Sequence, residues 1–155
     1  MEGARPATDL DAPRLAELVA EAVEEQREGR GGRIWSARET RALPAEETLR
    51  AAIEDPDVLV LAGTIDEVVV GYAVAHQEVL RTGERLGIVA DVFVDPGARG
   101  VGVGEALLDD VVAWCEAGGC IGIDALALPG NRATKNFFES FGFTARSIIV
   151  HRKLT

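Results

Sequence analysis

The sequence predicts an α/β fold of the mixed α+β kind, in which a mostly antiparallel sheet has helices on both faces. Three observations predict it: helical periodicity dominates the first third of the chain, a run of strands follows, and a strand-helix-strand unit comes after that run. The 155 residues, 47% hydrophobic and 27% charged, suffice for a core without a disulfide or a metal. We therefore expect one domain over residues 1–155.

The first third of the chain predicts two helices with a polar stretch between them. The apolar residues before position 27 recur at helical spacing, which predicts a helix over residues 11–27: Leu15, Leu18, Val19, Ala22 and Val23. Residues 27–41 are polar and rich in Gly and Arg, which is typical of an ordered loop or short helix near a ligand. Pro44 begins the second helix and Asp55-Pro56 ends it.

Three strands are predicted in the middle of the chain. Residues 58–62 and 68–79 alternate or are continuously apolar, with a polar turn between them, and a second turn at residues 82–84 separates them from a strand over 86–94. Short turns join antiparallel neighbours, so these three strands form a meander.

The last third adds a strand-helix-strand unit and two further elements. Apolar residues along one side predict a helix over 103–117, and a buried strand over 121–128 follows two glycines. Residues 131–141 predict another helix, and the alternation over 143–153 predicts a closing strand.

Composition narrows the partners and the location. The formal net charge of −10, from 26 acidic and 16 basic residues, disfavours nucleic acid and favours solubility, although it could also steer a cationic amine. The chain has no apolar run of membrane-spanning length and begins without a signal-peptide pattern, so we expect a cytoplasmic protein with no membrane partner. The spacing of Cys115, Cys120, His76 and His151 fits neither a disulfide framework nor a metal site, and Cys115 fits a core position.

A glycine-rich turn lies between the strand over 86–94 and the helix over 103–117. Gly100, Gly102 and Gly104 expose backbone amides beside the positive end of that helix, which could bind a pyrophosphate without a lysine. Alternating glycines also occur in tight turns and close helix packing, so the turn alone leaves both interpretations open. The absence of Gly-Lys-Ser or Gly-Lys-Thr argues against a nucleoside triphosphatase, and the position after a late strand argues against a Rossmann dehydrogenase.

Two segments of the chain resemble the motifs of the GNAT superfamily of N-acetyltransferases. Val92–Gly104 is similar to the superfamily signature, in which Arg or Gln is followed by x-x-Gly-x-Gly, and here Arg99, Gly102 and Gly104 match it. Asn131–Phe143 is similar to a later motif with an Asn, a helix bearing an aromatic pair and a closing Gly-Phe. The resemblance implies a GNAT-like sheet in which one parallel pair of strands splays apart.

The resemblance also implies acetyl-CoA as co-substrate and an amine as acceptor. Acetyl-CoA would lie in the V-shaped cleft of the splayed pair, with backbone groups of Val92 and Val94 on the pantetheine arm and Asn131 opposite them. Residues 99–104 would hold the pyrophosphate. The motif positions implied to bind the cofactor are Val92, Phe93, Val94, Arg99, Gly100, Val101, Gly102, Val103, Gly104, Asn131, Asn136 and Phe138.

The catalytic groups are less well determined by the resemblance. Many relatives use a Tyr on the last helix to protonate the departing thiolate, and Phe138 occupies that position here. Asp91 is the carboxylate expected to serve as general base, or to bind a cationic acceptor, although relatives often place a Glu one position earlier, where this chain has Ala90.

Tyr72 is expected in the core or in a cross-strand pair. Secondary base candidates are His76, Glu78 and Glu84, whose alternative is a solvated surface.

Three functions remain open from the sequence. The first is an acetyltransferase acting on an amine of a small molecule or a protein, in which Trp35 lines the acceptor pocket or instead caps the core. The second is an inert acyl-CoA-binding or sensing module, suggested by Phe138. The third is an interaction protein whose glycines serve packing. A homodimer is also expected if an edge strand over 147–153 pairs across a two-fold axis.

Overall fold

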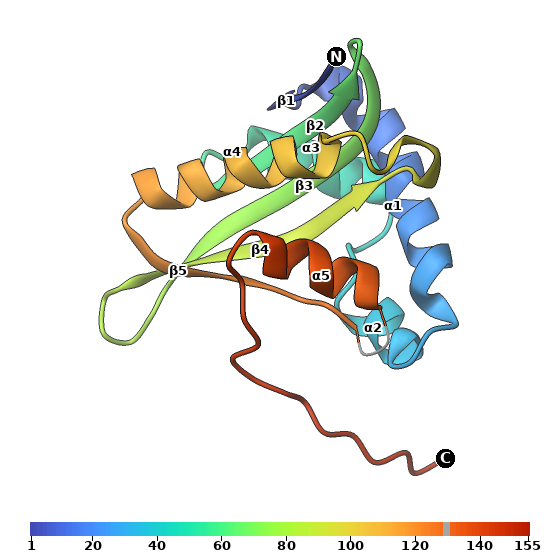
Figure 1. The fold of residues 1–155 in the computed structure, drawn as a ribbon, viewed down its shortest axis with the longest axis vertical. Coiled ribbons are helices and arrows are strands. Elements are labelled where there is room, and N and C mark those ends of the chain that lie inside the picture. Colours follow the sequence, from blue (N-terminus) through green and yellow to red (C-terminus); the bar gives the residue numbers. More distant parts are fainter. Residues whose placement is uncertain (129–130) are drawn as a thin grey trace.

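The computed structural model describes residues 1–128 and 131–155 (Figure 1). Two short 3₁₀ turns, Asp9–Asp11 and Pro96–Ala98, accompany the regular elements. Within the described ranges, no helix combines the length and the apolar character that crossing a membrane requires. The helices and strands, in chain order, are β1 (Glu2–Pro6), α1 (Ala12–Arg27), α2 (Gly32–Arg38), α3 (Ala45–Glu54), β2 (Val58–Ile65), β3 (Val68–Val79), β4 (Arg85–Val94), α4 (Val103–Ala117), β5 (Cys120–Ala125) and α5 (Arg132–Ser140).

The strands form one mixed sheet in the order β1-β2-β3-β4-β5. The first four strands are antiparallel to their neighbours, and β4 and β5 are parallel. The predicted fold class and the meander are confirmed. The sequence analysis did not predict β1, which pairs with β2 from Glu2 opposite Ile65 to Pro6 opposite Leu61.

Helices cover both faces of this sheet, as expected (Figure 1). Side chains alternate across a strand, so Tyr72 and Val74 of β3 face the core built with α1 and α3, whereas Ala73 and Ala75 face α4. The small alanines leave room for the large residues that α4 buries. Those residues are Leu107, Leu108 and Val111.

Gly63 of β2 allows α4 to lie close to the sheet. A Cβ atom at Gly63 would be 2.7 Å from Cγ1 of the buried Val103 and 3.0 Å from Cδ1 of Leu107. We therefore expect Gly63→Ala to lower the free energy of unfolding by about 1–3 kcal/mol through overpacking. Gly122→Ala is the matched control, because its Cβ would find its nearest neighbour at 3.9 Å. Equal denaturant midpoints for the two variants would contradict this account.

The closing strand predicted over residues 143–153 is wrong. In the described part of the chain, no strand follows β5, and residues 144–155 are exposed. Figure 1 shows this end of the chain leaving the sheet. The alternation is present, but a strand also requires a hydrogen-bonded neighbour, and the chain supplies none there. The strand predicted over 121–128 is also shorter, because β5 ends at Ala125.

Candidate functional site

β4 and β5 pair over only part of their length and then separate. The last pair along them is Val89 with Ala125, although β4 continues to Val94. At the same point, Val89 pairs with Ala75 of β3 and Asp91 with Val74, which leaves Ala90 as an extra residue. Such a bulge bends a strand and increases its twist. The bend in β4 therefore opens a gap beside the end of β5.

Along this gap β4 stays paired with β3 on one side, but among the described residues no strand pairs with its other side beyond Val89. The amide of Asp95 donates to the carbonyl of Val70 on β3 at 2.8 Å. Bonded and non-bonded pairs alternate along an antiparallel ladder, so the backbone groups of Val92 and Val94 point away from β3 and into the gap. The Val94 carbonyl accepts from Arg99 Nε at 2.8 Å. The strand thus presents a polar edge that β5 does not reach.

The glycine-rich turn connects this edge to the amino end of α4. Gly102 is the N-cap of α4, has a φ of 97° and provides no side chain to cap the helix. The first amides of a helix have no partner within it and carry its positive dipole end. Gly104 lets the turn approach α5, since a Cβ there would be 3.1 Å from Cε1 of Phe137. The turn therefore offers several backbone donors to an anion.

Arg99 joins this turn to α1. Its Nη1 and Nη2 atoms donate to the two carboxylate oxygens of Glu25 at 3.0 and 2.7 Å, and its guanidinium carbon lies 5.2 Å from the centroid of the Phe93 ring. The charge of Arg99 is thereby largely balanced, so the backbone amides of the turn are its free anion-binding groups.

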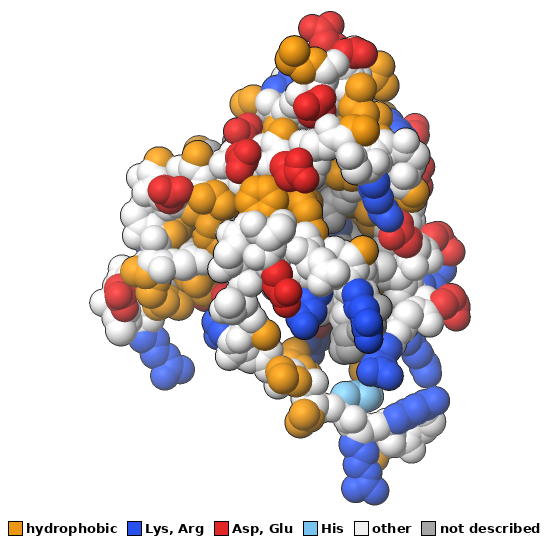
Figure 2. All heavy atoms as spheres, viewed as in Figure 1, with side chains coloured by type: hydrophobic (Ala, Val, Ile, Leu, Met, Phe, Trp, Pro, Cys, Tyr) orange, Lys and Arg blue, Asp and Glu red, His pale blue; other side chains and the backbone are white. Residues whose placement is uncertain are grey.

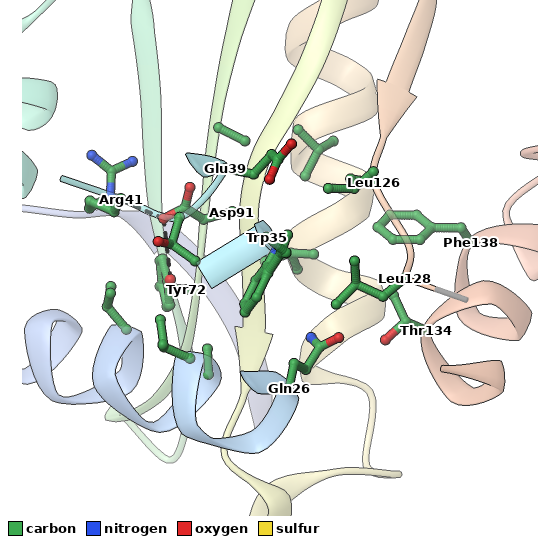
Figure 3. Close-up of a pocket in the computed structure, with 17 residues that line it drawn as sticks. Gln26, Trp35, Glu39, Arg41, Tyr72, Asp91, Leu126, Leu128, Thr134 and Phe138 are labelled. Carbon is green, nitrogen blue, oxygen red and sulfur yellow. Dashed lines mark hydrogen bonds and ion pairs between the residues drawn. The ribbon is translucent and has the colours of Figure 1, made fainter. Parts of the chain in front are cut away.

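A pocket lies between the bent part of β4 and the chain that follows β5 (Figure 3). Its open space, which includes solvent at the mouth, amounts to about 770 Å³. Trp35 and Phe138 are far apart in the sequence, but both side chains line this pocket (Figure 3). The lining comes from α1, α2, the loop after α2, β3, β4, the segment after β5 and α5, and its polar members are Gln26, Glu39, Thr40, Arg41, Tyr72, Asp91 and Thr134.

The carboxylate of Asp91 is held at one oxygen. Arg41 Nε donates to Oδ2 at 3.0 Å, and the Tyr72 hydroxyl donates to the same atom at 3.3 Å (Figure 3). The Arg41 and Asp91 side chains are only 12% and 13% exposed. Among the described residues, none hydrogen-bonds Oδ1. One oxygen is therefore fixed while the other is free to act on a molecule in the pocket.

A comparison with known protein families identifies the family of the chain. The profile of the Acetyltransferase (GNAT) family matches residues 15–143. The chain belongs to the GNAT family of acetyltransferases. A GNAT acetyltransferase uses acetyl-CoA as co-substrate, so the resemblance noted in the sequence is confirmed at the level of the family.

A curated relative of this GNAT chain is an amino-sugar acetyltransferase. Glucosamine 6-phosphate N-acetyltransferase of Trypanosoma brucei brucei is 37% identical over 65 residues, which are 42% of this chain. The matched segment also spans only 42% of the length of that relative.

Solved structures share the fold at low identity. The tetramutant of the BH1408 protein from Bacillus halodurans has a TM-score of 0.81 at 22% identity, over 97% of this chain and 99% of that chain. Ribosomal-protein-alanine N-acetyltransferase from Brucella melitensis biovar Abortus 2308 has a TM-score of 0.72 at 18% identity, over 100% of both chains. An aminoglycoside acetyltransferase from a soil metagenomic sample, in complex with sisomicin, has a TM-score of 0.72 at 18% identity, over 99% of this chain and 95% of that chain.

The residues of the later GNAT motif take different places in the structure. Asn131 caps α5, since its Oδ1 accepts from the Thr134 amide at 3.1 Å, and its Nδ2 donates to Gln26 Oε1 of α1 at 2.9 Å. Phe138 is buried in the pocket wall, whereas Asn136 is exposed and outside the lining. Asn131 thus links α5 to α1.

The structure does not bring the secondary base candidates to the pocket. None of the three lines the pocket: His76 and Glu78 of β3 pair with Ile88 and Leu86, on the turn side of the bulge, and Glu84 lies in the β3–β4 turn. Sequence reasoning missed Arg41 as the partner of Asp91. Its only sequence signal was membership of the polar stretch 27–41, which was predicted to lie near a ligand and which supplies both Arg41 and Trp35.

Tyr72, the only tyrosine of the chain, should remain un-ionised well into the alkaline range. It is 3% exposed, and burial, followed by the nearby Asp91 charge, raises the pKa of its hydroxyl well above the usual value. Its contribution to stability is complete below the unfolded pKa of about 10 and is lost as the pH rises towards the folded pKa. Ultraviolet titration should give no phenolate step before alkaline unfolding, and an ordinary step in urea. A normal step in the native protein would contradict this burial.

Proposed function

We propose that this chain is an acetyl-CoA-dependent N-acetyltransferase that transfers the acetyl group to a primary amine of a small molecule or a protein. The observation that carries the proposal is the gap between β4 and β5. One wall of the gap is the edge of β4, with the backbone groups of Val92 and the amide of Val94, and this wall leads directly to the glycine turn at the amino end of α4. The pantetheine arm of CoA carries amides and leads to a pyrophosphate, so it matches a row of backbone groups on β4 that is followed by the amides of the glycine turn.

The two walls of the gap divide the binding of the co-substrate between them. The backbone groups of Val92 and the amide of Val94 hydrogen-bond the pantetheine arm as an added strand would, while the Val94 carbonyl stays with Arg99. The amides from Gly100 to Gly104 bind the pyrophosphate at the helix terminus. Asn131 and Phe138 close the gap from the side of α5. Phe93 supports the turn because its ring packs against the guanidinium of Arg99.

The acceptor amine binds at the end of the pocket that contains Asp91. Its free Oδ1 accepts a hydrogen bond from the amine, and Arg41 and Tyr72 keep the carboxylate oriented. Trp35 and Glu39 lie on the same wall, so an aromatic face and a second carboxylate are available to a cationic acceptor. These groups make Trp35 and Asp91 the principal acceptor contacts.

The reaction requires little from the chain beyond positioning and one proton transfer. The amine nitrogen forms a bond to the thioester carbon as the carbon–sulfur bond breaks, and the proton lost by nitrogen passes to Asp91, directly or through one water. Phe138 has no proton to give, so the departing sulfur leaves as a thiolate and is protonated by solvent. A thiolate is a tolerable leaving group near neutral pH, so the missing tyrosine slows but does not prevent the reaction.

A release assay for free thiol over a panel of amines tests the proposal. The names of the similar proteins suggest three acceptor classes for the panel: an amino-sugar phosphate, an aminoglycoside and a peptide with an amino-terminal alanine. Free CoA together with an acetylated amine, identified by mass spectrometry, supports the proposal. Tight binding of acetyl-CoA with no product from any class would instead support the second candidate below.

The second candidate is an acyl-CoA-binding or sensing module without turnover. Phe138 favours it, because this side chain is buried in the pocket wall where a proton donor would be useful. Both candidates bind acetyl-CoA in the same gap, so turnover is the measurement that separates them.

A further inference from the structure

Two carboxylates of the pocket are held in the same way. Oδ2 of Asp91 accepts hydrogen bonds from Arg41 and Tyr72. Oε1 of Glu39 accepts two hydrogen bonds from Arg38, and the one from Nε measures 2.6 Å. Among the described residues, none hydrogen-bonds Oδ1 of Asp91 or Oε2 of Glu39. Each carboxylate is thus fixed by an arginine at one oxygen, and its other oxygen is free for a ligand.

Trp35 and Glu39 reach the pocket from the same turn of helix. At the end of α2, the Glu39 amide donates to the Trp35 carbonyl at 2.9 Å. Both residues line the pocket (Figure 3). The Glu39 side chain is 26% exposed, whereas its partner Arg38 is 68% exposed and lies outside the lining. An aromatic face beside a partly buried carboxylate favours an alkylammonium group as ligand.

The uncharged polar side chains of the lining mostly have partners within the protein. Gln26 Oε1 accepts from Asn131 at 2.9 Å, and the Thr40 hydroxyl donates to a backbone carbonyl at 2.8 Å. The Tyr72 hydroxyl donates to a carboxylate. A hydroxyl-rich acceptor such as a sugar would therefore find few side-chain partners here, whereas an alkyl chain needs none. The part of α1 before Gln26 provides an apolar wall for such a chain, with Val19, Ala22 and Val23.

The charges of the chain also favour a cationic acceptor. Arg41 is the only basic residue among the described residues of the lining, and it is paired with Asp91. The formal net charge is −10, and Figure 2 shows carboxylates spread over the upper part of one face, with Lys and Arg gathered in its lower part. A negative field raises the local concentration of a dication more than that of a monocation. The field thus assists encounter, while the two carboxylates of the pocket supply the specificity.

We propose that the acceptor is a linear diamine, one amine of which is acetylated beside Asp91 while the other, as an ammonium ion, binds Glu39 and Trp35. This inference rests on the proposed function, because it assigns the acceptor of the same reaction. The reacting nitrogen bonds to the thioester carbon as the carbon–sulfur bond breaks, and its proton passes to Asp91. The second ammonium keeps its proton throughout. Glu39 is therefore a specificity-determining residue that holds the far end of the acceptor.

The first test is calorimetric titration of amines into the full chain without co-substrate. The probes are diaminobutane and diaminopentane, with amines at both ends, and the matched monoamines pentylamine and hexylamine, in which a methyl group replaces the second amine. The native chain should bind each diamine about 10-fold more tightly than its matched monoamine, the gain expected from one charge-assisted hydrogen bond. Equal affinities within each pair would overturn the proposal.

Two variants assign the preference to Glu39. Glu39→Gln should lower the ratio of the two affinities to about one, because the amide retains the shape but loses the charge. Glu54→Gln is the matched control, since Glu54 is exposed at the end of α3 and outside the lining, and it should keep the native ratio. A ratio that survives in Glu39→Gln, or that falls equally in both variants, would show that Glu39 does not select the diamine.

Steady-state kinetics of thiol release provides a second readout. The far ammonium contacts no reacting atom, so Glu39→Gln should raise KM for diaminobutane about 10-fold and affect kcat much less. Thiol release with an amino-sugar phosphate, an aminoglycoside or a peptide, and no preference for diamines, would overturn the diamine assignment and leave the proposed function intact. No release with any amine, diamines included, would overturn the proposed function and the diamine assignment with it.

Discussion

Gly102→Val should weaken acetyl-CoA binding by about 100-fold, the loss expected when roughly two hydrogen bonds to a charged group disappear. Gly102 has a φ of 97°, which a β-branched residue strongly disfavours, and a Cβ there would be 3.1 Å from Cγ of Glu2. Relief of the strain moves the first amides of α4, which are the donors assigned to the pyrophosphate. Calorimetric titration with acetyl-CoA measures the change directly.

Gly119→Val is the control that separates binding from general strain. Gly119 also has a positive φ, 74°, and no atom lies within 4 Å of its Cβ position. It follows the carboxyl end of α4, so its substitution strains the backbone at the opposite end of the same helix. We expect a loss of stability with unchanged affinity. Equal affinity losses in the two variants would show that the turn is not a specific binding element.

Asp91→Asn should lower kcat/KM by about 100-fold or more while leaving the affinity for acetyl-CoA unchanged. The substitution keeps the shape of the side chain but removes the proton acceptor and the partner of Arg41. The expected result is therefore a defect in turnover, measured by thiol release at saturating acetyl-CoA with the best amine of the panel.

Two further variants define what the Asp91 result means. Asp109→Asn removes an equal charge from the exposed side of α4 and should change nothing. Arg41→Met removes the cation but keeps the carboxylate, and it should give a smaller loss than Asp91→Asn because Tyr72 still holds Oδ2. Full activity of Asp91→Asn would remove this carboxylate from the reaction.

Elements with a one-sided apolar pattern could be predicted from the sequence. The helices α1 and α4 and the strand β3 carry their burial pattern in their own residues, so periodicity was sufficient for them. β1 has no such pattern. It is an edge strand held by backbone pairing with β2 and by two hydrogen bonds from Arg5 to Asp11. Neither interaction produces a recognisable pattern in the residues of β1.

Residues 143–153, for which a closing strand was predicted, illustrate the opposite case. Their alternation correctly indicates strand propensity, but propensity does not provide a neighbour, and a strand forms only where a free edge is within reach.

The candidate site was predictable only where it is local. The glycine turn and the edge of β4 follow from a contiguous motif, and the structure places them beside one gap. The partners of Asp91 come from 50 and 19 positions away, and Arg99 is bound by Glu25 from 74 positions away. Contacts at such separations depend on the tertiary fold, so no local sequence pattern predicts them.

The most direct test of the central claim is titration of acetyl-CoA into the native chain, followed by the same titration into Gly102→Val and Gly119→Val. The account predicts saturable binding of one acetyl-CoA per chain, nearly lost in the first variant and retained in the second. Absence of binding to the native, folded chain would contradict the account, because the gap between β4 and β5 would then have no co-substrate to hold.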